Sequence, residues 1–79
     1  MPTLWEEAGF VFRFRMGDCE ERPHVHVTGN DGTAKVWFGP AALERSLGYS
    51  DPQIGRVLRI AGEHEREWLL EWEKRCGSD

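Results

Sequence analysis

Hydrophobic and polar residues alternate along the first half of the chain. If residues 10–15 are extended, one side of the segment carries Phe10, Phe12 and Phe14, and the other carries Val11, Arg13 and Arg15. A period of two predicts a half-buried β-strand. With a short strand predicted before it, the strands of the sheet occupy about residues 3–38.

Residues 24–38 predict an antiparallel hairpin, because two β-rich runs flank the turn sequence Gly-Asn-Asp-Gly. Pairing across this turn divides the residues between two faces: Val25, Val27, Ala34 and Val36 on one, and His24, His26, Thr28, Thr33, Lys35 and Trp37 on the other. A slip of one residue would mix apolar and polar side chains on both faces, which favours this register.

The second half of the chain has helical features. Pro40 near a helix start and Gly48 near a helix end predict a short helix over about 40–47.

Ser50 and Gln53 then form a capping-box pattern, and the apolar positions that follow lie on one stripe of a long helix over about 51–75. Strands followed by helices predict an α+β fold: a small antiparallel sheet of three or four strands, a short helix, and a long C-terminal helix packed on one sheet face.

Length and composition favour one domain over residues 1–79. The sequence shows neither a secretory signal nor an apolar run long enough to span a bilayer, which predicts a cytoplasmic protein without a membrane partner. In a reducing compartment, the two cysteines, Cys19 and Cys76, are expected to be thiols. So short a chain gains stability from self-association, so that a homodimer is compatible with its size.

The formal net charge of -4 argues against broad binding to nucleic acid. The polar face of the predicted sheet is nevertheless basic and aromatic: it collects Arg13, Arg15, His24, His26, Lys35 and Trp37. Such a face suits either a phosphate backbone with a stacked base or the acidic surface of a protein partner. The alternative interpretation is an ordinary solvated sheet face.

His24 and His26 lie two residues apart on a strand, so their side chains point to the same side about 6.6 Å apart. Together with Lys35 they are the candidate catalytic residues, since a histidine pair supplies acid and base while a cation stabilises a transferring phosphate. The same pair with Cys19 forms a candidate metal site, with His64 as an alternative third ligand. The histidines are also candidates for a haem edge, and the sequence identifies no cofactor.

The chain resembles a family of small bacterial proteins known as domain of unknown function 4160. The resemblance is carried by "MPT", "GFVFRF", "RPHVHV", "AKVWF" and "EHEREWLLEWE". The family pattern at the central motif is Pro-Pro-His-x-His, and Arg22 stands here in place of the first proline. The resemblance implies an α+β fold and a small cognate partner protein encoded next door, in pairs that look like toxin–antitoxin modules.

These observations favour a toxin-like component of a two-protein module, acting on RNA or a protein target through the basic His-x-His face. Whether it is an enzyme stays open. Candidate binding residues are Arg13, Arg15, Trp37 and His64, the last of which matches a recurrent polar position of the family. The alternatives are a non-enzymatic regulatory module that binds metal or haem through the histidine pair, and a plain interaction subunit.

Overall fold

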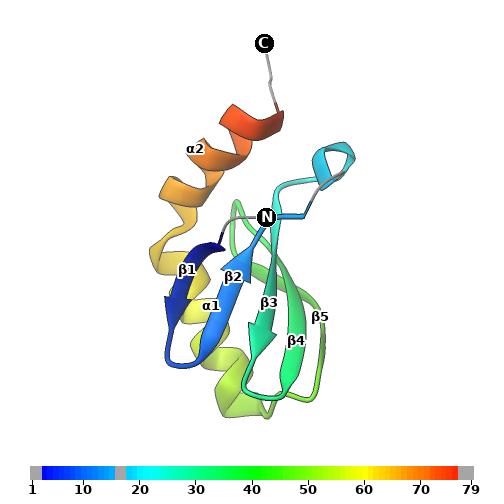
Figure 1. The fold of residues 1–79 in the computed structure, drawn as a ribbon, viewed down its shortest axis with the longest axis vertical. Coiled ribbons are helices and arrows are strands. Elements are labelled where there is room, and N and C mark those ends of the chain that lie inside the picture. The colour runs from blue at the N-terminus through cyan, green and yellow to red at the C-terminus, as the bar shows by residue number, and fades with distance from the viewer. Residues whose placement is uncertain (1–2, 16–17, 77–79) are drawn as a thin grey trace.

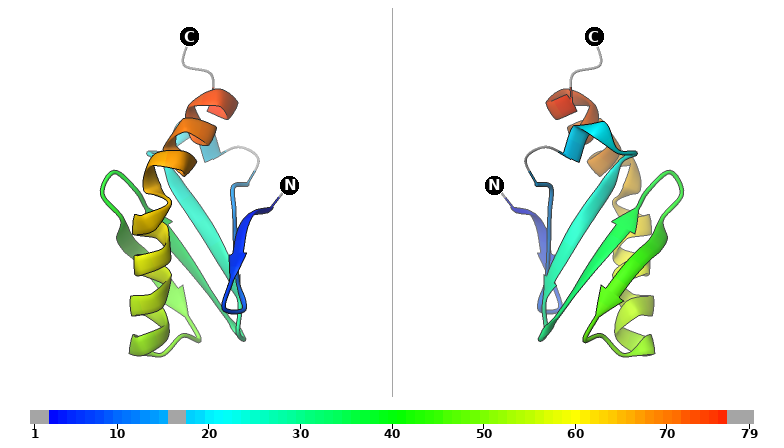
Figure 2. Two further views of the ribbon diagram at one scale, coloured as in Figure 1. Left: turned by 90° about the vertical axis from the view of Figure 1, so that its left-hand side faces the viewer. Right: turned by 90° about the vertical axis from the view of Figure 1, so that its right-hand side faces the viewer.

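The computed structural model describes residues 3–15 and 18–76 (Figure 1). The elements in chain order are β1 (Thr3–Glu7), β2 (Phe10–Arg13), the 3-10 helix η1 (Asp18–Glu20), β3 (His24–Gly29), β4 (Gly32–Trp37), β5 (Ala42–Leu47), α1 (Asp51–Glu63) and α2 (Glu65–Cys76). The strands form one antiparallel sheet in the order β1-β2-β3-β4-β5. Both helices cover the same face of that sheet (Figure 2). The predicted α+β class is confirmed, with five described strands in place of three or four.

The hairpin of β3 and β4 has the register predicted from the sequence. His24 pairs with Trp37, and His26 pairs with Lys35. At the turn, Asn30 and Asp31 have φ values of 51° and 64°. This left-handed backbone matches the twist of a two-residue hairpin turn, and Asn and Asp tolerate it better than most residues. The turn therefore sets which side chains of both strands face the helices.

The predicted helix over 40–47 is wrong, because the structure forms β5 there. Alanine, leucine, glutamate and arginine favour helices as single residues, but pairing with β4 satisfies the backbone groups of an otherwise open strand edge. The pairing shifts by one residue at Glu44, which has no partner of its own. Such a bulge reverses the alternation of side chains, so that Leu43 packs against the core and Arg45 lies on the opposite face.

The core lies between the sheet and the helices. Its buried members are Phe10, Phe12, Phe14, Val25, Val27, Ala34, Val36, Phe38, Val57, Ile60, Ala61, Trp68 and Trp72. Trp68 packs on Phe12 and Trp72 packs on Phe14, each with ring centres 5.2 Å apart. Large aromatic rings bury much apolar surface per residue, which is how so short a chain builds a core.

Two helices take the place of the single helix predicted over 51–75. α1 begins with the predicted capping box, in which Gln53 N donates to Ser50 Oγ and Ser50 N donates to Gln53 Oε1. It ends at Glu63, and the capping residue His64 has a φ of -107° and a ψ of 9°, which depart from helical values. α2 follows at once. Within the described part of the chain, no helix is long and apolar enough to cross a membrane.

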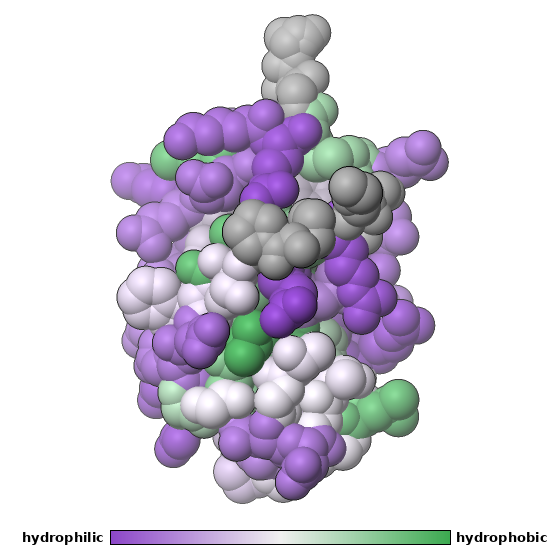
Figure 3. Space-filling view, viewed as in Figure 1, coloured by the Kyte–Doolittle hydropathy of each residue, from purple (hydrophilic) through white to green (hydrophobic). Residues whose placement is uncertain are grey.

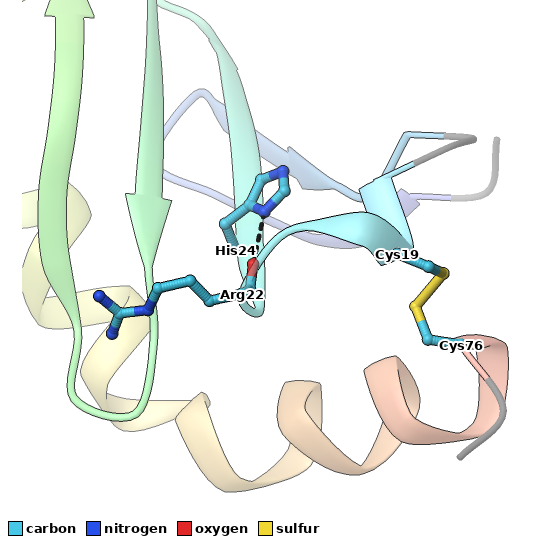
Figure 4. The surroundings of a disulfide bond; sticks show 4 residues. All are labelled: Cys19, Arg22, His24 and Cys76. Atoms are coloured by element: carbon cyan, nitrogen blue, oxygen red, sulfur yellow. Dashed lines mark hydrogen bonds between the residues drawn. A yellow bond between two sulfur atoms is a disulfide. The ribbon is translucent and has the colours of Figure 1, made fainter. Parts of the chain in front are cut away.

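Cys19 and Cys76 form a disulfide bond, so the prediction of two thiols is wrong. They are separated by 57 residues in sequence, yet their Cα atoms lie 5.3 Å apart. Because η1 carries Cys19 and the last turn of α2 carries Cys76, the bond ties the segment before β3 to the helix layer (Figure 4). No local pattern in the sequence predicts this contact, which follows from how α2 packs on the sheet.

Tyr49 holds the turn of the hairpin from outside. Its hydroxyl donates to the carbonyl oxygens of Gly29 and Gly32, at 2.7 and 3.0 Å, and burial raises the pKa of that hydroxyl above its usual value of 10.0. Gly29 has a φ of 102°, and a Cβ there would clash with the carbonyl oxygen of Gly9. Close approach of the hairpin to the turn between β1 and β2 therefore requires glycine at this position.

Gly29→Ala should lower the free energy of unfolding by about 2 kcal/mol or more, because a residue with a Cβ loses about 1–2 kcal/mol in left-handed backbone and the clash adds to it. Gly55→Ala is the matched control, since Gly55 lies in α1 and a Cβ there has nothing within 4 Å. It should raise the free energy of unfolding by about 0.5–1 kcal/mol. Urea unfolding measures both, and equal effects would contradict the hairpin geometry.

Candidate functional site

Four basic side chains line up across the sheet face that points away from the helices. Arg13 of β2 pairs with His26 of β3, His26 pairs with Lys35 of β4, and Lys35 pairs with Arg45 of β5. Paired residues share a side of the sheet, and neighbouring strands lie about 4.8 Å apart, so this cationic row spans about 14 Å. Figure 3 views this side of the molecule, where hydrophilic side chains predominate and a small hydrophobic area lies near the middle.

The sequence predicted three members of the cationic row and missed Arg45. The reason is the bulge in β5: Leu43 and Leu47 are four residues apart, a spacing typical of one side of a helix. In the structure they lie on opposite faces of a strand, and Leu47 is 74% exposed. Because of the bulge, the sequence of residues 42–47 shows only an irregular alternation of apolar and polar residues, which does not predict a strand.

A small hollow of about 60 Å³ opens beside the cationic row. Its polar lining consists of Arg15, His26, Thr33, Lys35, Arg45 and Ser46. A hollow of this volume has room for a small group such as an oxyanion. Three cations and a histidine around so small a space favour an anionic ligand group.

Arg13 adds a second sign of an anion site. Its Nε atom is buried and has no hydrogen-bond partner among the described residues. A buried donor without an acceptor lowers stability, and more so when it belongs to a charged group. Arg13 does not line the hollow, so an acceptor for this donor would have to bind elsewhere along the row.

Lys35 and Trp37 are contacted by the segment that precedes β3. Lys35 Nζ donates to Glu21 Oε1 at 2.6 Å, and the Lys35 side chain is only 14% exposed. The same Nζ lies 4.8 Å from the centre of the Trp37 ring, and Arg22 Cζ lies 5.1 Å from it. Both distances are typical of cation–π contacts. The structure thus brings two predicted site residues together and sets a carboxylate and a guanidinium against them.

His24 lies in the interior, with no exposed surface. Its Nδ1 is 2.9 Å from the carbonyl oxygen of Arg22 (Figure 4), and the rings of His26, Trp37 and Trp72 surround it at 5.0–5.4 Å. His26 is 8% exposed and reaches the hollow. Of the predicted catalytic set, the structure therefore brings together His26 and Lys35 and places His24 behind them.

The predicted metal ligands do not converge. Cys19 Sγ is bonded to Cys76 and so cannot act as a thiolate ligand to the histidines. Within the described ranges, no group of three or more histidine, cysteine, aspartate or glutamate side chains is arranged to hold a metal ion.

His64, predicted as a binding residue, lies at the junction of α1 and α2 and packs against β1. Its ring lies between those of Trp5 and Trp68, with centres 4.3 and 5.3 Å away. Its Nδ1 is 3.0 Å from Glu67 Oε1. These contacts make His64 part of the packing between β1 and the helices, and it does not line the hollow.

The fold and the site define a small α+β protein with a helix-covered core on one side of its sheet and a cationic row on the other. Residues 9–73 match the family described as domain of unknown function DUF4160, and the chain belongs to that family. No curated protein and no solved structure matches the chain. The matched range contains "RPHVHV" and the whole cationic row, whereas "MPT" lies outside it. The first two residues of "MPT" also lie outside the described residues.

His24→Ala should lower the free energy of unfolding by about 2–5 kcal/mol, because it empties a fully buried ring site in the core. Arg45→Ala is the control: its side chain is 73% exposed, so the change should stay within about 0.5 kcal/mol. Chemical denaturation of both variants measures the difference. A His24→Ala protein as stable as Arg45→Ala would show that His24 is not a core residue.

Proposed function

We propose that this chain is the toxin-like component of a two-protein bacterial module and that it binds RNA through the cationic row. The observation that carries the proposal is the register of four strands, which aligns Arg13, His26, Lys35 and Arg45 on the sheet face that points away from the helices. The pairing of family members with a neighbouring gene, as in toxin–antitoxin modules, supports the assignment to a two-protein module. The positive charge of the row supports RNA as the target.

Phosphate is the ligand group that this face suits best. A row of about 14 Å is longer than the distance between neighbouring phosphates of one strand, so it can meet more than one phosphate. The hollow beside Lys35 and Arg45 admits one compact oxyanion. Proteins that bind single strands combine such a charged track with an aromatic ring on which a base stacks, and Trp37 lies next to the row.

The net charge of -4 does not oppose this assignment, because binding responds to the local field. The same face would attract a partner protein with an acidic surface. We therefore assign the cognate partner to the same face, where its carboxylates would compete with RNA for the cations. An acidic protein as the cellular target itself is the outcome to expect if RNA does not bind.

We assign binding to the cationic row, and no reaction. His26 and Lys35 line the hollow, but His24 has no exposed surface. A mechanism that uses both histidines as acid and base would need both rings to contact the substrate, so the buried ring acts as support for the site.

Arg45→Glu should weaken binding of a fluorescent single-stranded RNA by about tenfold or more. It should also lower the slope of the logarithm of the binding constant against the logarithm of the salt concentration by about one, because one phosphate contact is lost. Arg59→Glu makes the same charge change on the outer side of α1, where the side chain is 58% exposed, and should leave affinity nearly unchanged. Fluorescence anisotropy over a range of salt concentrations measures both. Equal weakening by the two variants would show that only net charge matters, and no binding by the wild type would overturn the RNA target.

Controlled induction in bacteria tests the toxin-like role. The wild type should arrest growth, an Arg13→Glu/Arg45→Glu double variant should not, and Arg59→Glu should arrest growth like the wild type. Equal soluble expression of the three proteins is the control. Arrest by the double variant would place the activity elsewhere on the molecule, and growth with the wild type would refute the toxin-like role.

A further inference from the structure

The segment of residues 19–23, which we call the strap, runs from η1 to β3 and is fastened at both ends. At its start, Cys19 is bonded to Cys76 of α2. At its end, Phe38 N donates to the carbonyl oxygen of Pro23 at 3.1 Å. The strap is therefore held between the helix layer and the sheet (Figure 4).

The middle of the strap occupies the positions that the proposed function gives to a nucleotide. The Glu21 carboxylate is 2.6 Å from Lys35 Nζ, where a phosphate oxygen would lie. The planar guanidinium of Arg22 lies over the Trp37 ring, where a base would stack. A negative group and a planar group on neighbouring residues thus imitate the two parts of the ligand.

The disulfide bond between Cys19 and Cys76 is the attachment of the strap that reduction can break. Glu21 is half exposed, and an ion pair that reaches solvent is weak by itself. The disulfide fixes the backbone two residues before Glu21, which limits how far this carboxylate can move from Lys35. Cys19 is exposed and Cys76 is half-buried, so an attacking thiolate can reach the bond.

We infer that the strap is a redox-controlled cover of the RNA-binding face, an inference that rests on the proposed function. A dithiol reductant transfers two electrons and two protons to the Cys19–Cys76 bond, giving two thiols, and itself becomes a disulfide. The released strap moves Glu21 away from Lys35 and Arg22 away from Trp37. The oxidised protein is then the closed form and the reduced protein the open form.

Amine labelling tests the strap without RNA. The chain has two lysines, Lys35 and Lys74, and the Lys74 side chain is 75% exposed, so Lys74 serves as the internal reference. An acylating reagent followed by peptide mass spectrometry should modify Lys35 slowly in oxidised protein and several-fold faster, relative to Lys74, after reduction with a dithiol. An unchanged ratio in reduced protein that circular dichroism shows to be folded overturns the inference.

Glu21→Gln tests the strap with the disulfide intact. The oxidised variant should label faster at Lys35 and bind single-stranded RNA several-fold more tightly than the oxidised wild type, because the competing carboxylate is gone. Glu20→Gln, on the exposed neighbour, is the matched control and should behave as the wild type. If Glu21→Gln keeps wild-type affinity, the carboxylate does not compete with RNA and the inference fails.

RNA affinity in both redox states separates this inference from the proposed function. Reduction should tighten RNA binding of the wild type, and that of Glu21→Gln by less, because only the contact of Arg22 with Trp37 is left to release in the variant. Equal RNA affinity of oxidised and reduced wild type, with Lys35 labelling that does respond, refutes redox control of binding while leaving the RNA target in place. If neither reduced wild type nor Glu21→Gln binds RNA, the proposed function itself fails.

Discussion

The register between β3 and β4 is the constraint on which the other features of this protein depend. Side chains alternate across a strand, so a slip of one residue would turn Val25 and Val27 outward and bring His26 against the helices. The same pairing therefore determines both the core on one face of the sheet and the cationic row on the other. The left-handed residues Asn30 and Asp31 and the hydroxyl of Tyr49 keep that pairing in place at the turn.

The hollow distinguishes two buried histidines that the sequence presents as equivalent. His24 begins β3 at the end of the sheet where Trp72 of α2 reaches it, so that its ring is enclosed. His26, two residues further on, lies over the middle of the sheet and borders the hollow. The aromatic contacts of His24 therefore support the strand from which His26 and its neighbours in the row project.

Charge acts locally in this molecule. Acidic residues outnumber basic ones by 14 to 10 in the whole sequence, yet three strands and the bulged β5 bring four basic residues into one row. The carboxylate that reaches this row comes from the strap, and the strap is bonded to the far end of the chain. The state of the basic face is thereby connected to the packing of α2, which lies on the other side of the sheet.

The sequence by itself determined the α+β class, the hairpin register, the helix start at Ser50 and three members of the cationic row. These rest on turn geometry, capping and period-two alternation, which involve residues close together in the chain. Only the tertiary structure decided the strand at residues 42–47, the burial of His24 and the contacts of the strap. Each of these depends on residues distant in sequence. The local sequence does not show that a strand edge is open, that a tryptophan encloses a side chain or that a cysteine has a partner.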